Sequence, residues 1–403
     1  MSDQDSRPLL EGIRVVELAN WMFAPMAGTI LAEHGADVVK IEPLPGDALR
    51  GLVPRVGDNI DWVWELTNRG KRSLALDIRS EAGSQILHRL LDRADVLIVN
   101  IRGQALQRAG LDYPSLAEPF PRLIYAHATG YGPVGPDANR PAFDELSYWA
   151  RGGFMAVLGP PESEPVRLVG AMGDLPSAMN LAAAIFAALY ARERTGLGQR
   201  VNCSLYGGGI WANGIAVQSA LTTGENLPRR SRLEQPNALY NSYRTADDRW
   251  IQFAMLQDDL YWDTVAEVLE QPEMLTDPRF ASHQLRREHA TQAILLLELA
   301  IGSRTLADWA PRFNEADLPW AAAATPVEIA HDPQASENGY VREHHHRSGA
   351  SLPLVGLPFS LEQNPLGSIV SAPELGQHTE EVLLELGCDW EEISQFKQQG
   401  AIP

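Results

Sequence analysis

Cysteine and lysine are both scarce in this chain. Of 403 residues only two are cysteine, Cys203 and Cys388, and they form no CxxC pair, so a disulfide framework is not expected. Only three residues are lysine, and the formal net charge is −19. General binding of nucleic acid needs a basic footprint, so this charge argues against nucleic acid as a partner.

Several sequence motifs of common cofactor sites are also absent. The first expected strand–helix turn, residues 18–25, has no GxGxxG, which argues against a nicotinamide or flavin enzyme. The chain contains no Walker A lysine motif and no HExxH. The triplet His344-His345-His346 lies in a polar stretch without further ligands at metal spacing, so we expect a solvated loop and no metal.

Targeting signals are equally missing. We expect no membrane span, because no apolar run reaches the required length, and residues 1–8 show no signal-peptide pattern. The composition, 45% hydrophobic and 21% charged, is that of an ordinary globular protein. We therefore expect a cytoplasmic protein without a membrane partner.

Strand-like and helix-like segments alternate over the first 130 residues. Such alternation predicts an α/β fold with a mostly parallel sheet, helices on both faces, and ligands at the carboxyl ends of the strands. The expected strands are 13–18, 36–41, 73–77, 95–100 and 123–127, with helices at 24–34 and 80–93. From about residue 224 the pattern of expected elements changes, with a strand at 250–255 and helices at 260–269 and 291–301. We therefore expect a separate, smaller domain from about residue 224 to about residue 325.

The stretch from Gly170 to Arg200 organises the prediction of a site. Its Ala- and Leu-rich run from Pro176 to Arg194 predicts a buried helix that ends at Gly196. Asp174 then lies at or just before the helix N-terminus. It fits an N-cap, and it equally fits a carboxylate nucleophile that the helix dipole keeps ionised.

Basic residues gather early in this acidic chain, in 68–72 and then at Arg79, Arg102 and Arg108. Cations near strand ends suit a ligand that carries phosphate, although each of them also fits an ordinary surface charge.

The chain resembles the family III CoA-transferases over nearly its whole length. No single motif is specific, but their order and spacing together are. The motifs are residues 10–17 with Ala24-Pro25, 35–43 with Gly46-Asp47 and Arg50, 68–74, Gly130-Tyr131-Gly132, Gly173-Asp174, and 194–200.

The resemblance implies a site and a fold. It places the nucleophile on Asp174 and coenzyme A, as co-substrate, on Met22, Phe23, Leu76, Asp77, Ile78, Arg79, Asn100, Ile101, Arg102 and Arg108. It implies a Rossmann-like large domain (1–224, completed by 326–403), a smaller α+β domain (225–325), and an interlocked homodimer of ring-like chains. In two places the chain departs from formyl-CoA transferase: residues 232–237 contain no glycine where that enzyme has a glycine-rich closing loop, and Pro43 replaces a basic CoA contact.

The implied reaction is transfer of CoA from an acyl-CoA thioester to a carboxylic acid. A carboxylate needs no separate base to attack a thioester, because it is ionised at pH 7. Asp174 would form an acyl anhydride and then an aspartyl-CoA thioester, with backbone N–H groups near the helix start stabilising the oxyanions.

Two alternatives remain. A 2-methylacyl-CoA racemase, from the same superfamily, needs a histidine where this chain has Phe143, and phenylalanine carries no proton. A non-catalytic CoA-binding protein would not need the intact Gly173-Asp174 pair.

Aromatic residues are frequent around the expected site, at Trp21, Met22-Phe23, Phe143 and Tyr148-Trp149. If half of them face the cleft, a small dianion would bind poorly because its second charge would be buried unpaired. We therefore expect a medium-sized, largely apolar carboxylic acid as the acceptor.

Overall fold

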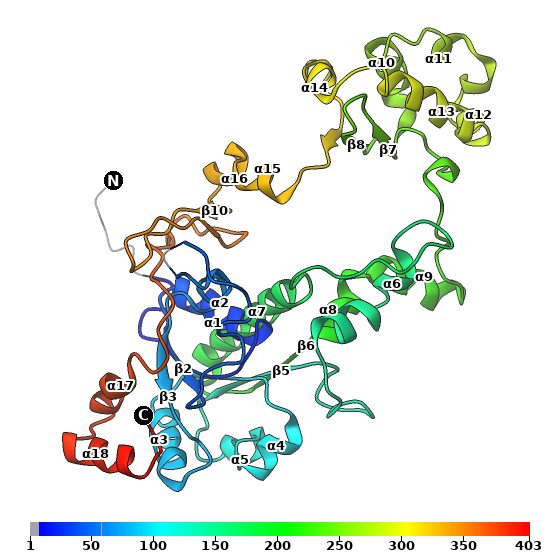
Figure 1. Ribbon diagram of the computed structural model, residues 1–403. Helices are drawn as coiled ribbons and strands as arrows, with labels where there is room; N and C mark the ends of the chain where they lie inside the picture. Colours follow the sequence, from blue (N-terminus) through cyan, green and yellow to red (C-terminus); the bar gives the residue numbers. More distant parts are fainter. Residues whose placement is uncertain (1–7, 58) are drawn as a thin grey trace. The chain divides into compact units, whose positions relative to one another are not determined.

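A computed structural model describes residues 8–57 and 59–403 of the chain (Figure 1). Residues 1–7, part of the stretch without a signal-peptide pattern, lie outside the described range. The chain divides into two compact units. The first comprises the described chain up to Ala156 together with Arg167–Gly224 and Pro333–Pro403, and the second comprises Val157–Val166 and Glu225–Asp332. We expected domain boundaries at residues 224 and 325. In the structure the chain passes from one unit to the other after Gly224 and again after Asp332.

The first unit is built on a six-stranded sheet in which every neighbouring pair is parallel, as the alternating sequence pattern predicts. The strand order is that of a doubly wound nucleotide-binding fold. From one edge to the other the strands are β3 (Arg72–Ala75), β2 (Asp37–Glu42), β1 (Arg14–Leu18), β4 (Val96–Val99), β5 (Ile124–Thr129) and β6 (Arg200–Ser204). Strand β6, with its polar sequence RVNCS, was not among the expected strands.

Helices cover both faces of this sheet (Figure 1). One apolar core lies under α1 (Phe23–Glu33) and α7 (Asp174–Thr195). The core of the other face lies under α3 (Glu81–Leu91), α4 (Gly103–Arg108), α5 (Tyr113–Ala117), α17 (Thr379–Glu385) and α18 (Trp390–Gln398). The C-terminal segment therefore returns to complete the unit that the N-terminal segment begins.

Helix α7 is the longest helix in the described chain. Its alanine-rich sequence favours helix, and Gly196, with φ of +74°, ends it in the left-handed conformation that glycine adopts without strain. Contrary to the sequence expectation, its 22 residues are long and apolar enough to cross a membrane by length and composition alone. One face of α7 packs in the core beside the sheet, and core helices of soluble proteins meet the same criterion.

Shorter elements complete the first unit. They are α2 (Trp62–Asn68), a π-helical turn (Glu145–Ala150), α6 (Phe154–Val157, its last residue in the second unit), α8 (Leu205–Ala212), α9 (Gly214–Thr223), α16 (Pro333–Glu337), β10 (Val341–Arg342) and β11 (Leu354–Val355).

The second unit combines an antiparallel sheet with helices around its own apolar core, which includes Phe253, Trp309 and Phe313. The sheet order is β7 (Ser242–Arg244), β8 (Trp250–Phe253), β9 (Trp320–Ala322). The helices are α10 (Trp262–Val268), α11 (Glu273–Thr276), α12 (His283–Glu288), α13 (Ala290–Ile301), α14 (Leu306–Glu315) and α15 (Pro326–Ala330).

Candidate active site

A cavity of about 530 Å³ opens at the carboxyl ends of β1, β4 and β5. Strand β1 pairs with β2 on one side and with β4 on the other. The strand order therefore reverses between β1 and β4, and the loops that follow these two strands diverge there. Ligands usually bind at this point in such sheets. Among the residues that line it are Asn20, Trp21, Phe23, Asn100, Ile101, Arg102, Thr129, Arg140, Phe143, Asp144 and Asp174.

Two asparagines join the ends of the adjacent strands at this cavity. The backbone N–H of Asn20 donates to Oδ1 of Asn100 at 3.1 Å, and Nδ2 of Asn100 donates to the carbonyl oxygen of Asn20 at 2.6 Å. This reciprocal pair uses both polar atoms of the Asn100 side chain. The side-chain amide of Asn20 has no such partner within the described residues, so it is free to meet a substrate.

Asp174 is the first residue of α7, and it does not cap the helix. The N-cap position is Gly173, which makes no side-chain hydrogen bond. The cap comes instead from Asp144, whose Oδ2 accepts the backbone N–H groups of Gly173 at 2.8 Å and Asp174 at 3.0 Å. The N-cap interpretation of Asp174 is therefore wrong, and its carboxyl is available at the cavity.

Gly173 is required by the close approach of Asp144 and Tyr148. A Cβ atom at this position would lie 2.1 Å from Oδ1 of Asp144 and 2.4 Å from Cγ of Tyr148. Side chains of the protein itself therefore fill the space beside Gly173.

The electrostatic setting of Asp174 opposes ionisation. Burial, followed by the nearby carboxylates of Asp144 and Glu145, raises the pKa of Asp174 to about 7. Desolvation and like charge therefore act against the ionisation that the sequence analysis attributed to the helix dipole. A carboxyl whose pKa lies near 7 at the wall of a cavity is typical of a catalytic group.

Five of the predicted site residues meet at the cavity. Phe23, Asn100, Ile101 and Arg102 line it together with Asp174. They come from the starts of α1, α4 and α7 and from the end of β4, segments far apart in the sequence.

The other predicted CoA contacts lie elsewhere in the described structure. Met22 packs beside the small apolar cluster around Trp64, and Leu76 is buried in the core of the opposite face. Asp77 does not line the cavity either: its N–H donates to the Ala401 carbonyl, and its Oδ1 accepts the backbone N–H of Arg79, which is exposed. Ile78 packs against the same core as Leu76, and the exposed Arg108 donates from Nε to the Gln104 carbonyl.

Several site residues were missed or underrated by the sequence analysis. Asn20, Thr129 and Arg140 line the cavity, and Asp144 holds the start of α7. The available signal was a polar residue at or shortly after the end of a strand: Thr129 is the last residue of β5, and Asn20 follows β1 after Ala19. Of the aromatic residues, Trp21, Phe23 and Phe143 line the cavity, whereas Tyr148 and Trp149 are buried and do not line it.

Two basic residues of the stretch 68–72 are engaged inside the protein. Arg69 and Lys71 are buried, with Arg69 paired to Glu33 at 2.7 Å and Lys71 paired to Glu17 at 2.9 Å. These two cations hold the protein together, so a phosphate-bearing ligand would need other residues.

The histidine triplet is not a solvated loop throughout. His344 is buried, and its Nε2 lies 3.4 Å from Oε2 of Glu65, while Nε2 of His346 lies 3.3 Å from Oε1. The expectation of a solvated loop is wrong for His344 and His346, because Glu65, a residue distant in the sequence, contacts both rings.

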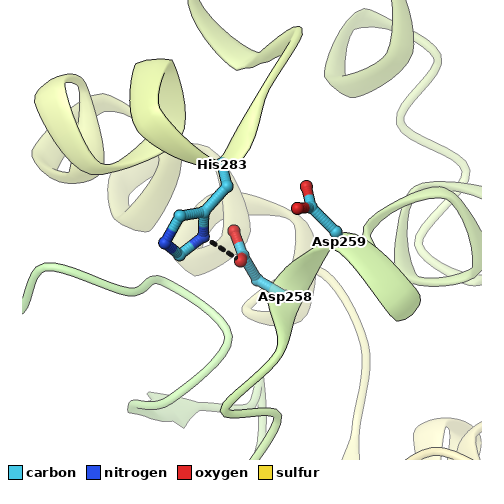
Figure 2. Close-up of side chains that lie close together, drawn as sticks. All are labelled: Asp258, Asp259 and His283. Carbon is cyan, nitrogen blue, oxygen red and sulfur yellow. Dashed lines mark hydrogen bonds and ion pairs between the residues drawn. The ribbon is translucent and has the colours of Figure 1, made fainter.

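One group of acidic and histidine side chains in the second unit resembles a metal site by proximity (Figure 2). Nδ1 of His283 contacts Oδ1 of Asp258, with Asp259 nearby. Arg286 already neutralises the two carboxylates, donating from Nε to Asp258 at 2.7 Å and from Nη2 to Asp259. An arginine in this place competes with a cation, so this group is a salt-bridge cluster.

Comparison with known proteins assigns the architecture. A model of the family described as "CoA-transferase family III" matches residues 10–379. The chain is 33% identical to "Cinnamoyl-CoA:phenyllactate CoA-transferase" of Clostridium sporogenes, covering 98% of this chain and 97% of that protein. It is also 33% identical to "(R)-2-hydroxy-4-methylpentanoate CoA-transferase" of Clostridioides difficile, covering 98% and 99%. The fold matches a crystal structure of a CAIB/BAIF family protein from Brucella suis, with a TM-score of 0.83, 30% identity, and coverage of 94% of this chain and 99% of that one.

Proposed function

Because the chain belongs to CoA-transferase family III, we propose that it moves CoA from an acyl-CoA to a carboxylic acid through covalent intermediates on Asp174. The observation that carries this proposal is the position of Asp174, which combines a cavity wall, a helix start and a pKa of about 7. Coenzyme A is the co-substrate of the family, and no step in the proposed chemistry needs a metal.

The first half-reaction releases the donor acid. A carboxylate oxygen of Asp174 attacks the thioester carbonyl carbon, and the tetrahedral intermediate collapses with loss of the CoA thiolate. This leaves a mixed anhydride between Asp174 and the acyl group. The thiolate then attacks the aspartyl carbonyl carbon of the anhydride, which releases the donor as a free carboxylate and leaves Asp174 as a CoA thioester.

The second half-reaction runs these steps in reverse with the acceptor. The acceptor carboxylate attacks the aspartyl thioester, expels the thiolate and forms a new anhydride. Attack by the thiolate on the acceptor's carbonyl carbon gives the new acyl-CoA and returns Asp174 as a carboxylate. No proton is transferred in the balance of either half, so the proposed reaction needs no separate general acid or base.

The oxyanions need donors other than the start of α7. The N–H groups of Gly173 and Asp174 already donate to Asp144, and that of Leu175 donates to the carbonyl of Ala171. Within the described residues, the side-chain amide of Asn20 lies at the cavity wall as a donor without a hydrogen-bond partner. We therefore assign oxyanion stabilisation to Asn20 in place of the backbone donors that the sequence analysis favoured.

The acyl side of the cavity favours an apolar, medium-sized acid. Trp21 and Phe143 present apolar rings there, and Phe143 occupies the position that a racemase of this superfamily would need as histidine. The two relatives named above carry phenyllactate and 2-hydroxy-4-methylpentanoate in their names, acids of this size and polarity. We propose acceptors of the same class for this chain, with Asn100 to Arg102 contacting the CoA moiety.

A homodimer is part of the proposal. Helix α9 has no buried residue in the single chain, and the apolar side chains of Trp211, Ile215 and Leu221 around it are more than 75% exposed. A second copy would cover this surface, as in the interlocked arrangement that the family resemblance implies. Native mass spectrometry at micromolar concentration tests this, and a monomer would contradict it.

The deciding experiment traps the covalent intermediate. Purified protein is mixed with acyl-CoA donors (acetyl-CoA, succinyl-CoA and cinnamoyl-CoA), and the intact mass is read before and after addition of phenyllactate, succinate or oxalate. We expect CoA attached to the wild type and absent from Asp174→Asn, with turnover lowered about 10³-fold or more in the variant. Normal turnover by Asp174→Asn would refute the role of Asp174, and retained CoA binding by that variant is the control for its fold.

A further inference from the structure

Trp21 has a backbone conformation that large side chains seldom adopt. Its φ is +68°, in the left-handed region, and it is the one aromatic residue with positive φ in the described chain. A strained non-glycine residue persists only where its surroundings enforce the geometry, and such residues gather at functional sites. Trp21 lies at the wall of the cavity that holds Asp174.

Three consecutive residues are held at this turn. Nζ of Lys40 donates to the carbonyl of Ala19 at 2.7 Å, and Asn100 makes its reciprocal pair with Asn20. The N–H of Trp21 donates to Oδ1 of Asp47 at 3.2 Å. The backbone therefore has a hydrogen bond from a distant side chain at each step through the strained position.

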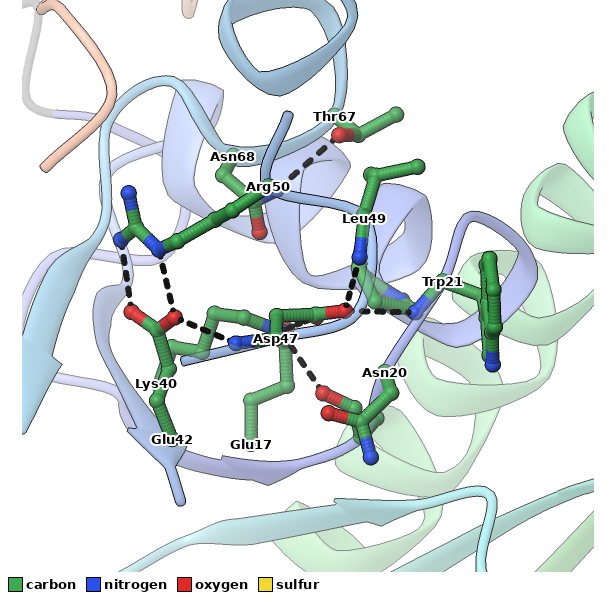
Figure 3. A network of polar contacts seen from close by, with 12 residues as sticks. Glu17, Asn20, Trp21, Lys40, Glu42, Asp47, Leu49, Arg50, Thr67 and Asn68 are labelled. Carbon is green, nitrogen blue, oxygen red and sulfur yellow. Dashed lines mark hydrogen bonds and ion pairs between the residues drawn. The ribbon is translucent and has the colours of Figure 1, made fainter. Parts of the chain in front are cut away.

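The groups that hold Trp21 belong to a buried ionic network (Figure 3). Nζ of Lys40 lies 2.9 Å from Oδ2 of Asp47 and 3.0 Å from Oε1 of Glu17, whose other oxygen lies 2.9 Å from Nζ of Lys71. All four side chains are fully buried. Buried ion pairs are poor stabilisers compared with apolar residues of the same volume. Two of the three lysines in the chain nevertheless lie in this network, so stability alone does not account for it.

The indole of Trp21 points away from this network, as Figure 3 shows. It is 38% exposed and meets the ring of Phe143 edge to face, with centroids 5.6 Å apart and an interplanar angle of 88°. Phe143 is itself 50% exposed. Two large apolar rings thus lie at the cavity with much of their surface exposed. The ionic network holds the backbone of Trp21 through Asp47.

We infer that Trp21, with Phe143, is the wall that selects the organic group of the carboxylic acid, and that Asp47 is a positioning residue that acts through the backbone of Trp21. The inference rests on the proposed CoA transfer and adds to it the residues that decide the substrate. An aromatic or branched acid would bury the exposed surface of the two rings, whereas acetate would leave that surface exposed to solvent.

The first test removes the indole and relieves the strain together. Trp21→Gly is compatible with the positive φ, so we expect a thermal midpoint no lower than that of the wild type. With the donor that the wild type uses fastest, the ratio of kcat/KM for 3-phenylpropanoate to that for acetate should fall at least tenfold. The loss should appear mainly as a higher KM for the aromatic acid.

The matched control is Trp390→Ala, which removes an indole that is 60% exposed on α18, over the opposite face of the sheet. This variant should keep the acceptor ratio of the wild type. An unchanged ratio in Trp21→Gly, or an equal fall in kcat for both acids, would overturn the inference even where CoA transfer itself is intact. Failure of the wild type to transfer CoA to either acid would count against the proposed function instead.

The second test separates Asp47 from Trp21. Asp47→Asn keeps an oxygen that can accept the Trp21 N–H but removes the charge that faces Lys40. We expect a lower acceptor ratio in Asp47→Asn and, since both residues act through one indole, no further fall when Trp21→Gly is added. Additive effects of the two substitutions would show that Asp47 acts by another route and would remove it from the inference.

Discussion

The carboxylate of Asp144 holds the backbone N–H of Asp174 at 3.0 Å while its charge raises the pKa of the Asp174 side chain. One residue therefore fixes the position of the proposed nucleophile and opposes its ionisation. The negative charge of Asp144 favours the protonated form of Asp174, so part of this carboxyl is neutral near pH 7.

Asp144→Asn should shift the pH dependence of catalysis. Below its pKa of about 7 Asp174 is protonated and cannot attack, so wild-type kcat/KM should rise with pH through about 7. Replacing Asp144 by asparagine removes a negative charge, which lowers the pKa of Asp174 and moves the acid limb to lower pH. The oxygen of the amide can still accept the two N–H groups, so the structure should persist.

Glu145→Gln serves as the graded control for this pH prediction. Glu145 raises the pKa of Asp174 less than Asp144 does, so its neutralisation should move the acid limb in the same direction by a smaller amount. The measurement is kcat/KM for the acyl-CoA between pH 5 and 9. An acid limb that stays in place, or moves to higher pH, in Asp144→Asn contradicts the assignment.

Gly173→Ala should damage both stability and turnover. The added Cβ would collide with Oδ1 of Asp144 and with the Tyr148 ring, and such overpacking costs about 1–3 kcal/mol of unfolding free energy. Because Asp174 follows directly, kcat should fall as well. Gly367→Ala, where nothing lies within 4 Å of the new atom, is the control and should change neither quantity. Equal midpoints in urea for the two variants would show that the space beside Gly173 is not needed.

Local patterns predicted five of the six strands of the sheet and the start of α7 to within two residues, because apolar runs and alanine-rich segments report directly on burial. Asp174 was found in this way. The sequence could not show that Asp144, 30 positions earlier, caps α7, since that contact exists only after two elements pack. The sequence also could not show the conformation of Trp21, because a positive φ is normally predicted only at glycine. The basic stretch 68–72 suggested either a phosphate ligand or ordinary surface charge, yet Lys71 pairs with Glu17 inside the core, where lysine is seldom found.

Lys40→Met should destabilise the protein strongly. The substitution leaves the buried carboxylates of Glu17 and Asp47 without their shared cation, and breaking a buried pair in this way costs about 3–5 kcal/mol. Lys397→Met removes a half-exposed lysine that pairs with Glu380, and exposed pairs contribute about 0–1 kcal/mol. Urea unfolding of both variants measures the difference. If Lys40→Met costs no more than Lys397→Met, the network around Trp21 is not held by charge.

Asn20→Ala should lower kcat and leave the KM for the acyl-CoA within a few-fold. The side-chain amide of Asn20 lies at the cavity wall without a partner among the described residues, and loss of one oxyanion donor costs about 10²–10³-fold in kcat. The backbone of Asn20 keeps its pair with Asn100 in this variant, because that pair uses only the main-chain N–H and carbonyl of residue 20. Asn100→Ala breaks the pair instead, so it should disturb the turn and raise KM and lower kcat together. Steady-state kinetics on one acyl-CoA and one acceptor separate the two patterns. A rise in KM alone in Asn20→Ala would assign Asn20 to ground-state binding and leave the oxyanion to another donor.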